Sequence, residues 1–147
     1  MFEEIIKQLK YDGEIWEAEL SFPMLGDGVL LSIESGNPNE ISRHQKELLE
    51  WIYINIEKVY PKVQKSVFIY YKENSETYRS ALGEYADELM PIISNESEVW
   101  EYVSEPGIYI SDDEESNEIH LEYECSFDLE HGLRVVLENG SIKRVDH

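Results

Sequence analysis

The chain has 147 residues, of which 32 are Asp or Glu and 12 are Lys or Arg, so its formal net charge is −20 at pH 7. A chain of this length typically folds as one domain around one core, and we expect a single domain over residues 1–147. The negative charge repels phosphate backbones and anionic lipid, which argues against nucleic-acid or membrane binding. It fits either a basic protein partner or an acidic surface that serves only to keep the protein dispersed, and the second is the commoner case.

The sequence also limits the compartment and the cofactors. Cys125 is the only cysteine, so an internal disulfide and a cysteine-rich zinc site are excluded. The first residues lack the basic start and apolar run of a secretory signal, and no apolar stretch approaches the ~20 residues of a membrane span. We therefore expect a cytoplasmic protein. Gly26-Asp-Gly28 lacks the lysine and the strand-to-helix context of a phosphate-binding loop, and the sequence predicts no cofactor.

The first third of the chain predicts a short helix and a hairpin. The apolar spacing over residues 2–9 is helical. Over residues 15–22 the apolar side chains alternate with Glu17, Glu19 and Ser21, which indicates a strand with one acidic face. After the turn at Gly26-Asp-Gly28, residues 29–34 form a more continuously apolar run, which predicts a second strand buried further in.

A long helical block follows. Asn37 is predicted as the N-cap, with Pro38 at the first helical position, and the apolar stripe extends to about Asn74. Because an interior proline loses a hydrogen bond and clashes with the preceding turn, Pro61 predicts either a kink or the start of a new helix. Residues 75–85 fit either a helical turn or an anchored loop, and residues 89–93 fit an irregular segment or an edge strand.

The last third predicts a short helix and four strands. The short helix covers residues 97–103 and is broken at Pro106-Gly107, and a strand begins at Ile108. Residues 119–127 alternate strictly between apolar and polar and predict a central strand. Asn139-Gly140 predicts a type I′ turn between strands 133–138 and 141–145. The expected fold class is α+β, with a mostly antiparallel sheet of about six strands packed against a long, proline-interrupted helical block, in the order α-β-β-α-α-(α)-β-β-β-β.

The C-terminal pattern resembles the signature of a known family. Cys125-Ser-Phe-Asp-Leu-Glu-His-Gly-Leu133 is similar to the sequence Cys-x-aromatic-Asp-x-Glu-His-Gly-Leu-Gly, followed by a short hairpin, of an uncharacterised bacterial domain family. This chain departs from the pattern at Phe127, where tryptophan is usual, and at Arg134, where a second glycine is usual. The resemblance implies no established activity. It implies, as one function of such domains, inhibition of a bacterial toxin as an immunity protein.

The best candidate for chemistry is the polar segment Asp128 to Gly132, which we call the corner. Asp128, Glu130 and His131 combine carboxylates with a histidine that titrates near neutral pH, a set able to act as acid and base in a small hydrolase or other enzyme. The alternative is structural: Asp128 bonds nearby amides and His131 bonds across the turn. A metal site using Glu130, His131 and His120 matches no ligand motif, so no metal is predicted.

The other candidate is an acidic surface on the sheet. Glu17 and Glu19 line the polar side of one strand, and Glu122 and Glu124 line that of another. Like charges side by side cost stability unless a cation lies near them. Either Lys143, Arg144 or Arg134 supplies that cation, or a basic protein such as a toxin does. We expect a non-enzymatic protein-binding domain, and the sequence leaves its oligomeric state open.

Overall fold

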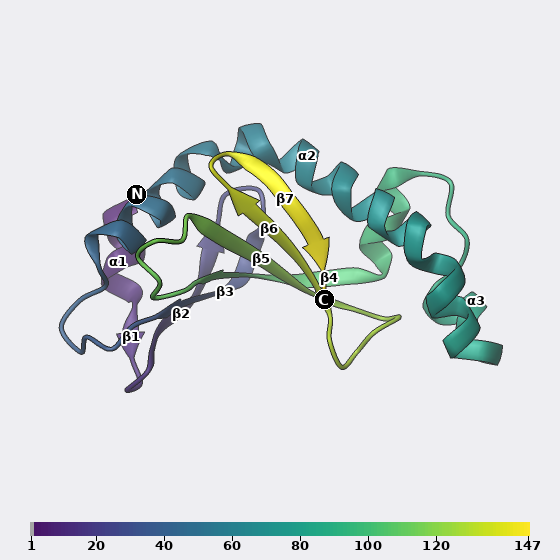
Figure 1. Ribbon diagram of the computed structural model, residues 1–147, viewed down its shortest axis with the longest axis horizontal. Helices are drawn as coiled ribbons and strands as arrows, with labels where there is room; N and C mark the ends of the chain where they lie inside the picture. Colours follow the sequence, from purple (N-terminus) through teal and green to yellow (C-terminus); the bar gives the residue numbers. More distant parts are fainter. Residues whose placement is uncertain (1) are drawn as a thin grey trace.

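Seven strands form one sheet in which the spatial order equals the chain order, from β1 to β7 (Figure 1). The computed structural model describes residues 2–147, apart from the side chain of residue 105, and every statement below refers to these residues. The strands are β1 (Lys10–Tyr11), β2 (Ile15–Phe22), β3 (Gly26–Glu34), β4 (Val103–Ile110), β5 (Glu118–Cys125), β6 (Leu133–Glu138) and β7 (Ser141–Asp146). β3 and β4 pair in parallel and the other neighbours pair antiparallel. The predicted α+β class and the mostly antiparallel sheet are confirmed.

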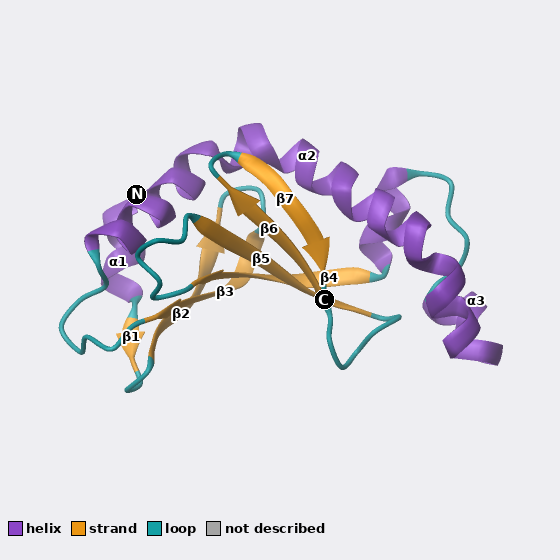
Figure 2. Ribbon diagram, in the orientation of Figure 1, coloured by secondary structure: helices purple, strands orange, loops and turns teal. Residues whose placement is uncertain are grey.

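The helices cover one side of the sheet and its far end. They are α1 (Phe2–Gln8), α2 (Arg43–Leu82), α3 (Ala86–Leu89) and two 3₁₀ helices, η1 (Gly83–Tyr85) and η2 (Glu96–Glu101). Figure 2 shows α2 arching over the sheet and extending past it toward α3. A helix of 40 residues is about 60 Å long, about twice the length of an eight-residue strand, so its C-terminal half cannot rest on the sheet alone. That half buries Val67 and Tyr71 in the core, and the ring of Tyr71 packs against Phe127.

The start of α2 lies five residues later than predicted. Asn37 accepts a hydrogen bond from the backbone N–H of Asn39 and so closes a local turn instead of capping the helix. Ser42 is the N-cap: its hydroxyl accepts from the N–H of Gln45, and the Gln45 side chain accepts from the N–H of Ser42. This reciprocal pair is a capping box, and it fixes the helix start.

The helix also continues through Pro61, so the prediction of a new helix there is wrong. Pro61 is exposed, and a long surface helix is normally convex on its solvent side, where its hydrogen bonds are longest. A missing backbone donor is tolerated on that side. The continuous helix also decides between a helical turn and a loop for residues 75–85. Residues 75–82 belong to α2, and η1 follows.

Two strands differ from prediction. β4 begins at Val103, and Pro106-Gly107 lies inside it, at a register shift between Ser104 and Gly107. Proline is accepted in a strand at such irregularities because no ladder donor is required there. In β3, Val29, Leu31 and Ile33 face the core, but Leu30 points to the opposite side and is 48% exposed. The strand is interior in the sheet, yet only one of its faces is buried.

The C-terminal ribbon matches the prediction. Ile119, Leu121, Tyr123 and Cys125 of β5 are buried, and Asn139 and Gly140 take positive φ angles of 51° and 83° in the turn between β6 and β7. β5 lies between β4 and β6. The core is the layer between these inward side chains and the apolar stripe of α2. None of the described helices combines the length and the apolar composition needed to cross a bilayer.

Candidate functional site

The sheet has an open face, the side turned away from α2, and its polar side chains fall into rows that run across the strands. One row follows the strand register from Glu19 on β2 to Leu30 on β3, Gly107 on β4 and Glu122 on β5. Glu19, Leu30 and Glu122 are exposed. Because neighbouring strands are about 4.8 Å apart, the two glutamates lie about 14 Å from each other with the exposed leucine between them.

Gly107 leaves a gap in this row. A Cβ at this position would lie 3.1 Å from the carbonyl oxygen of Leu30, closer than most side chains approach backbone, so the glycine allows β3 and β4 to pair closely. The absence of a side chain also leaves Leu30 without a neighbour on its β4 side. We name Glu19, Leu30, Gly107 and Glu122 the acidic row.

Ion pairs inside the chain neutralise carboxylates on β5, β6 and β7, which we call the neutralised half of the open face. Lys143 Nζ lies 2.7 Å from Glu118 and 3.3 Å from Glu138, and the guanidinium groups of Arg134 and Arg144 bond Asp146 at 2.9 and 2.7 Å. Arg134 stands opposite Glu122 in register, but its Nε donates to Asp146. Within the described residues, the ion pairs include neither Glu17, Glu19 nor Glu122.

Glu118 is the centre of the neutralised half. His120 Nε2 lies 3.0 Å from its Oε1, and Lys143 and Arg144 approach its Oε2. The hydrogen bond to His120, followed by that from Lys143, lowers the pKa of Glu118 to about 2, although burial opposes the shift. On the same face, burial and a hydrogen bond to Glu34 raise the pKa of Tyr109 to about 12.

The structure separates the two pairs of glutamates that the sequence suggested as one surface. Glu17 and Glu19 lie on β2, whereas Glu122 and Glu124 lie on β5, and β3 and β4 intervene. All four belong to the open face. The like charges are therefore not direct neighbours across strands, and β3 supplies an apolar residue between them.

The corner brings together two of its three predicted residues. Oδ1 of Asp128 accepts hydrogen bonds from the backbone N–H of His131 and from its ring Nδ1, both at 3.1 Å. Oδ2 accepts from the hydroxyl of Tyr78 at 3.2 Å. Burial alone would raise the pKa of Asp128, but these hydrogen bonds lower it below its ordinary value. Glu130 is exposed, and within the described residues no hydrogen bond or ion pair joins it to Asp128 or His131.

The surrounding contacts give the corner a structural role. The backbone N–H of Gly132 donates to the carbonyl of Asp128 at 2.9 Å, and Ser126 Oγ donates to the carbonyl of Leu89 at 2.6 Å. Phe127 packs against the rings of Tyr71 and Tyr78. Oδ1 of Asp128 therefore closes the corner on itself, and Oδ2 holds the corner against α2. Burial also raises the pKa of the Cys125 thiol beside it to about 11, so this thiol stays protonated near neutral pH.

In the described part of the chain, no group of three or more His, Cys, Asp or Glu side chains is arranged to hold a metal ion. His120 bonds Glu118 on the open face, whereas His131 bonds Asp128 at the corner. The three residues considered for a metal site are thus engaged in different parts of the structure or exposed.

Sequence reasoning missed two features of these sites. The exposure of Leu30 was obscured by the apolar run around it, although the alternation of Leu30 and Ser32 with Val29, Leu31 and Ile33 is a usable signal. The contact of Tyr78 with Asp128 joins residues 50 positions apart and has no local signal.

Comparison with known proteins yields one match. The model of a domain of unknown function, DUF6985, matches residues 5–147. The chain belongs to this family. No curated protein and no solved structure matches the DUF6985 domain described above. The resemblance to an uncharacterised domain family is confirmed, and the match covers nearly the whole chain rather than the C-terminal signature alone.

Proposed function

We propose that this DUF6985 domain is a protein-binding module whose open face binds a basic protein through the acidic row. The observation behind the proposal is that Glu19 and Glu122 flank the exposed Leu30, while Arg134, Lys143 and Arg144 pair with other carboxylates. An exposed leucine adds apolar contact area, and unpaired carboxylates on both sides supply orientation and fast association with a cationic surface. The net charge of −20 adds long-range attraction for the same partner.

The partner is a protein with an apolar side chain between basic residues spaced about 14 Å apart, matching the three-strand separation of Glu19 and Glu122. Nucleic acid and anionic membranes do not fit a surface of this charge. The most specific form of the proposal is an immunity-type inhibitor of a bacterial toxin, in which covering a basic functional surface of the toxin blocks its action.

The proposal is tested by affinity capture from the native host with three forms of the domain. The first is wild type, and the second removes the acidic row by Glu19→Gln, Leu30→Ser and Glu122→Gln. The third is a matched control on the exposed side of α2, with Ile54→Ser, Glu57→Gln and Glu73→Gln, which makes the same changes of charge and polarity. We expect one protein captured by wild type and control, lost in the acidic-row variant, and released by raised salt.

Capture by all three forms, or by none at low salt, would contradict the proposal. The immunity form requires in addition that the captured protein arrests growth when expressed alone. Co-expression of wild type or control should then restore growth, and co-expression of the acidic-row variant should not.

The alternative is a small hydrolase or other enzyme that uses Asp128, Glu130 and His131. The 3.1 Å contact between Asp128 and His131 is its only support in the geometry. An enzyme of this kind requires that His131→Ala abolishes a measurable activity with little loss of stability. The hydrogen bonds that occupy both oxygens of Asp128 favour the structural role instead.

A further inference from the structure

The outer side of β2 is only partly paired. β1 has two residues, and its pairing with β2 ends at Lys10 opposite Glu17. β2 continues to Phe22, and within the described residues no strand pairs with its outer side beyond Glu17. Figure 1 shows α1 leading directly into the short β1 at this end of the sheet, and the backbone of α1 does not run alongside β2. We call the outer side of residues 18–22 the free edge.

Hydrogen bonds at the start of β2 show which backbone groups point to the free edge. The N–H of Asp12 donates to the carbonyl of Ile15 at 3.1 Å, and the N–H of Ile15 donates to Oδ1 of Asp12 at 2.8 Å, so the peptide groups of Ile15 face outward. Because this direction alternates along a strand, the N–H and C=O groups of Glu19 and Ser21 face outward too. The extra residue at the register shift after Leu20 belongs to β3, so the alternation in β2 is kept.

A pocket of about 400 Å³ adjoins the free edge. It lies between α1 and the turn after β2, and its lining includes Ile5 of α1, Phe22 of β2 and Tyr53 of α2. Ile5 and Phe22 are buried, and the Tyr53 ring meets the Phe22 ring edge-on with centroids 5.7 Å apart. On an added strand, a side chain opposite Phe22 would point to the same side of the sheet as Phe22. Unpaired backbone groups with an apolar site in register are the features by which a sheet edge recognises an extended peptide.

The charge of the edge strand selects the occupant. Glu17 and Glu19 are exposed on the open face, and Lys10 of β1 stands opposite Glu17 in register. An added strand that continues the line of β1 places its own side chain beside Glu19 in the same way, and a basic residue is favoured there. A second copy of this chain would instead bring the same glutamates and a further charge of −20, so like charges oppose pairing between copies.

We propose that the free edge binds an extended segment of a basic protein as an added strand. The backbone of the segment pairs with the N–H and C=O groups of Glu19 and Ser21. A basic side chain lies beside Glu19, and the apolar side chain opposite Phe22 enters the pocket, so the segment is recognised by alternating basic and apolar residues. The inference goes beyond the proposed function and does not require it, because the edge is built from backbone groups that the acidic row does not use.

The probe is a phage-displayed library of random dodecapeptides, selected on the immobilised wild-type domain. The strongest binder is synthesised, and amide hydrogen exchange of the ¹⁵N-labelled domain is followed by NMR with and without it. We expect exchange at the amides of Glu19 and Ser21 to slow about tenfold or more, because each gains a hydrogen-bond acceptor. The amides of Ala18 and Leu20 face β3 and serve as internal references that should not change.

Two substitutions and one change of the probe separate backbone pairing from side-chain contact. Ser21→Pro removes the outward N–H at an edge position, where proline is accepted, and should weaken the peptide about tenfold or more. Ser21→Ala keeps that N–H and should leave binding within about twofold. N-methylation of the peptide is tested on the wild-type domain, so it does not depend on how the proline variant folds. Methyl groups on alternate residues, those facing β2, should each cost about tenfold or more, and those between them should cost little.

Equal binding to the Ser21→Pro and Ser21→Ala domains, or equal effects of N-methylation at successive peptide residues, would overturn the proposal. Unchanged exchange at Glu19 and Ser21, or a selection without binders, would overturn it too. Protection of these two amides that rises with the concentration of the free domain would assign the edge to a second copy and refute a partner strand. The acidic-row variant keeps the backbone of β2, so failures of the two proposals are distinguishable.

Discussion

The hydroxyl of Tyr78, near the end of α2, donates a hydrogen bond of 3.2 Å to the carboxylate of Asp128, in the corner between β5 and β6. The same carboxylate accepts two hydrogen bonds from His131. One side chain therefore joins the C-terminal half of the long helix to the sheet. This explains why the corner carries an aspartate without any need for catalysis.

Asp128→Ala should destabilise the fold much more than His131→Ala. The aspartate change removes three hydrogen bonds and leaves the Tyr78 hydroxyl only the Tyr70 hydroxyl as a partner, at a cost of about 2–3 kcal/mol. The His131 side chain is 54% exposed, and its removal leaves its backbone N–H bonded to Asp128, so the cost is about 0.5–1 kcal/mol. Urea unfolding followed by circular dichroism measures both. Equal losses would contradict the structural role of Asp128.

Gly132→Ala should be one of the most damaging single changes in the chain. Gly132 has a φ of +71°, and a Cβ on it would lie 2.5 Å from the backbone oxygen of Tyr123. Backbone in β5 cannot move aside without breaking the ladder, so we expect a loss of about 3 kcal/mol or more. Gly36→Ala is the control, because a Cβ there meets nothing within 4 Å and the position has no positive φ. A comparable melting temperature for both variants would refute the prediction.

Gln45→Met should destabilise the protein although it preserves side-chain size. The Gln45 amide is buried and donates to the carbonyl oxygens of Glu34 at 2.6 Å and Ser111 at 2.8 Å, which connects the start of α2 to the ends of β3 and β4. Methionine leaves both carbonyls unpaired and breaks the capping box, at a cost of about 2–4 kcal/mol. Gln8→Met, at an exposed position, should cost less than about 0.5 kcal/mol in the same denaturant titration.

Acid should remove the contribution of Glu118 to stability. Its pKa is about 2 in the folded protein, below the ordinary value of a glutamate, so the folded state binds its proton less readily than the unfolded state. The contribution is fully present above about pH 5 and is lost as pH falls toward 2. Glu118→Gln should therefore cost about 1–2 kcal/mol at pH 7, allowing for solvent screening, and only a small fraction of that near pH 2. A difference in unfolding free energy that stays constant over this range would disprove it.

The sequence by itself determined the elements whose signals are local. The alternation over residues 119–127, the Asn139-Gly140 turn and the apolar stripe on the long helix each reflect backbone geometry repeated every two or 3.6 residues, and all three are confirmed. Capping was less well predicted, because Asn37 has Glu40 and Ser42 has Gln45 three residues later, so both have the spacing of a capping box. The structure shows the reciprocal hydrogen bonds between Ser42 and Gln45.

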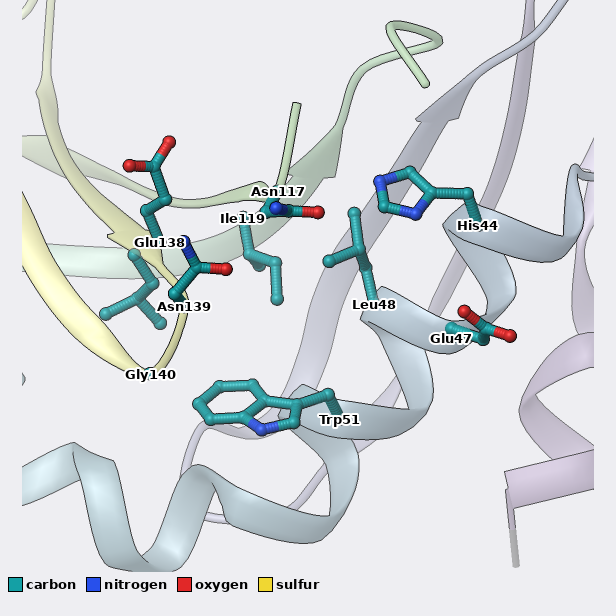
Figure 3. A pocket seen from close by; sticks show the side chains of 10 residues that line it. His44, Glu47, Leu48, Trp51, Asn117, Ile119, Glu138, Asn139 and Gly140 are labelled. Atoms are coloured by element: carbon teal, nitrogen blue, oxygen red, sulfur yellow. The ribbon is translucent and has the colours of Figure 1, made fainter. Parts of the chain in front are cut away.

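Only the tertiary structure decided which side chains meet. Continuation of α2 through Pro61 depends on that residue facing solvent, and the acidic row depends on β3 and β4 lying between β2 and β5. A pocket between the start of α2 and the end of the sheet (Figure 3) joins residues 44–51 with residues 117–140, and the contact of Tyr78 with Asp128 spans 50 positions. Local patterns fix which face of an element is apolar, but the free energy of burying those faces together selects the neighbours, and that selection has no signature within a single segment.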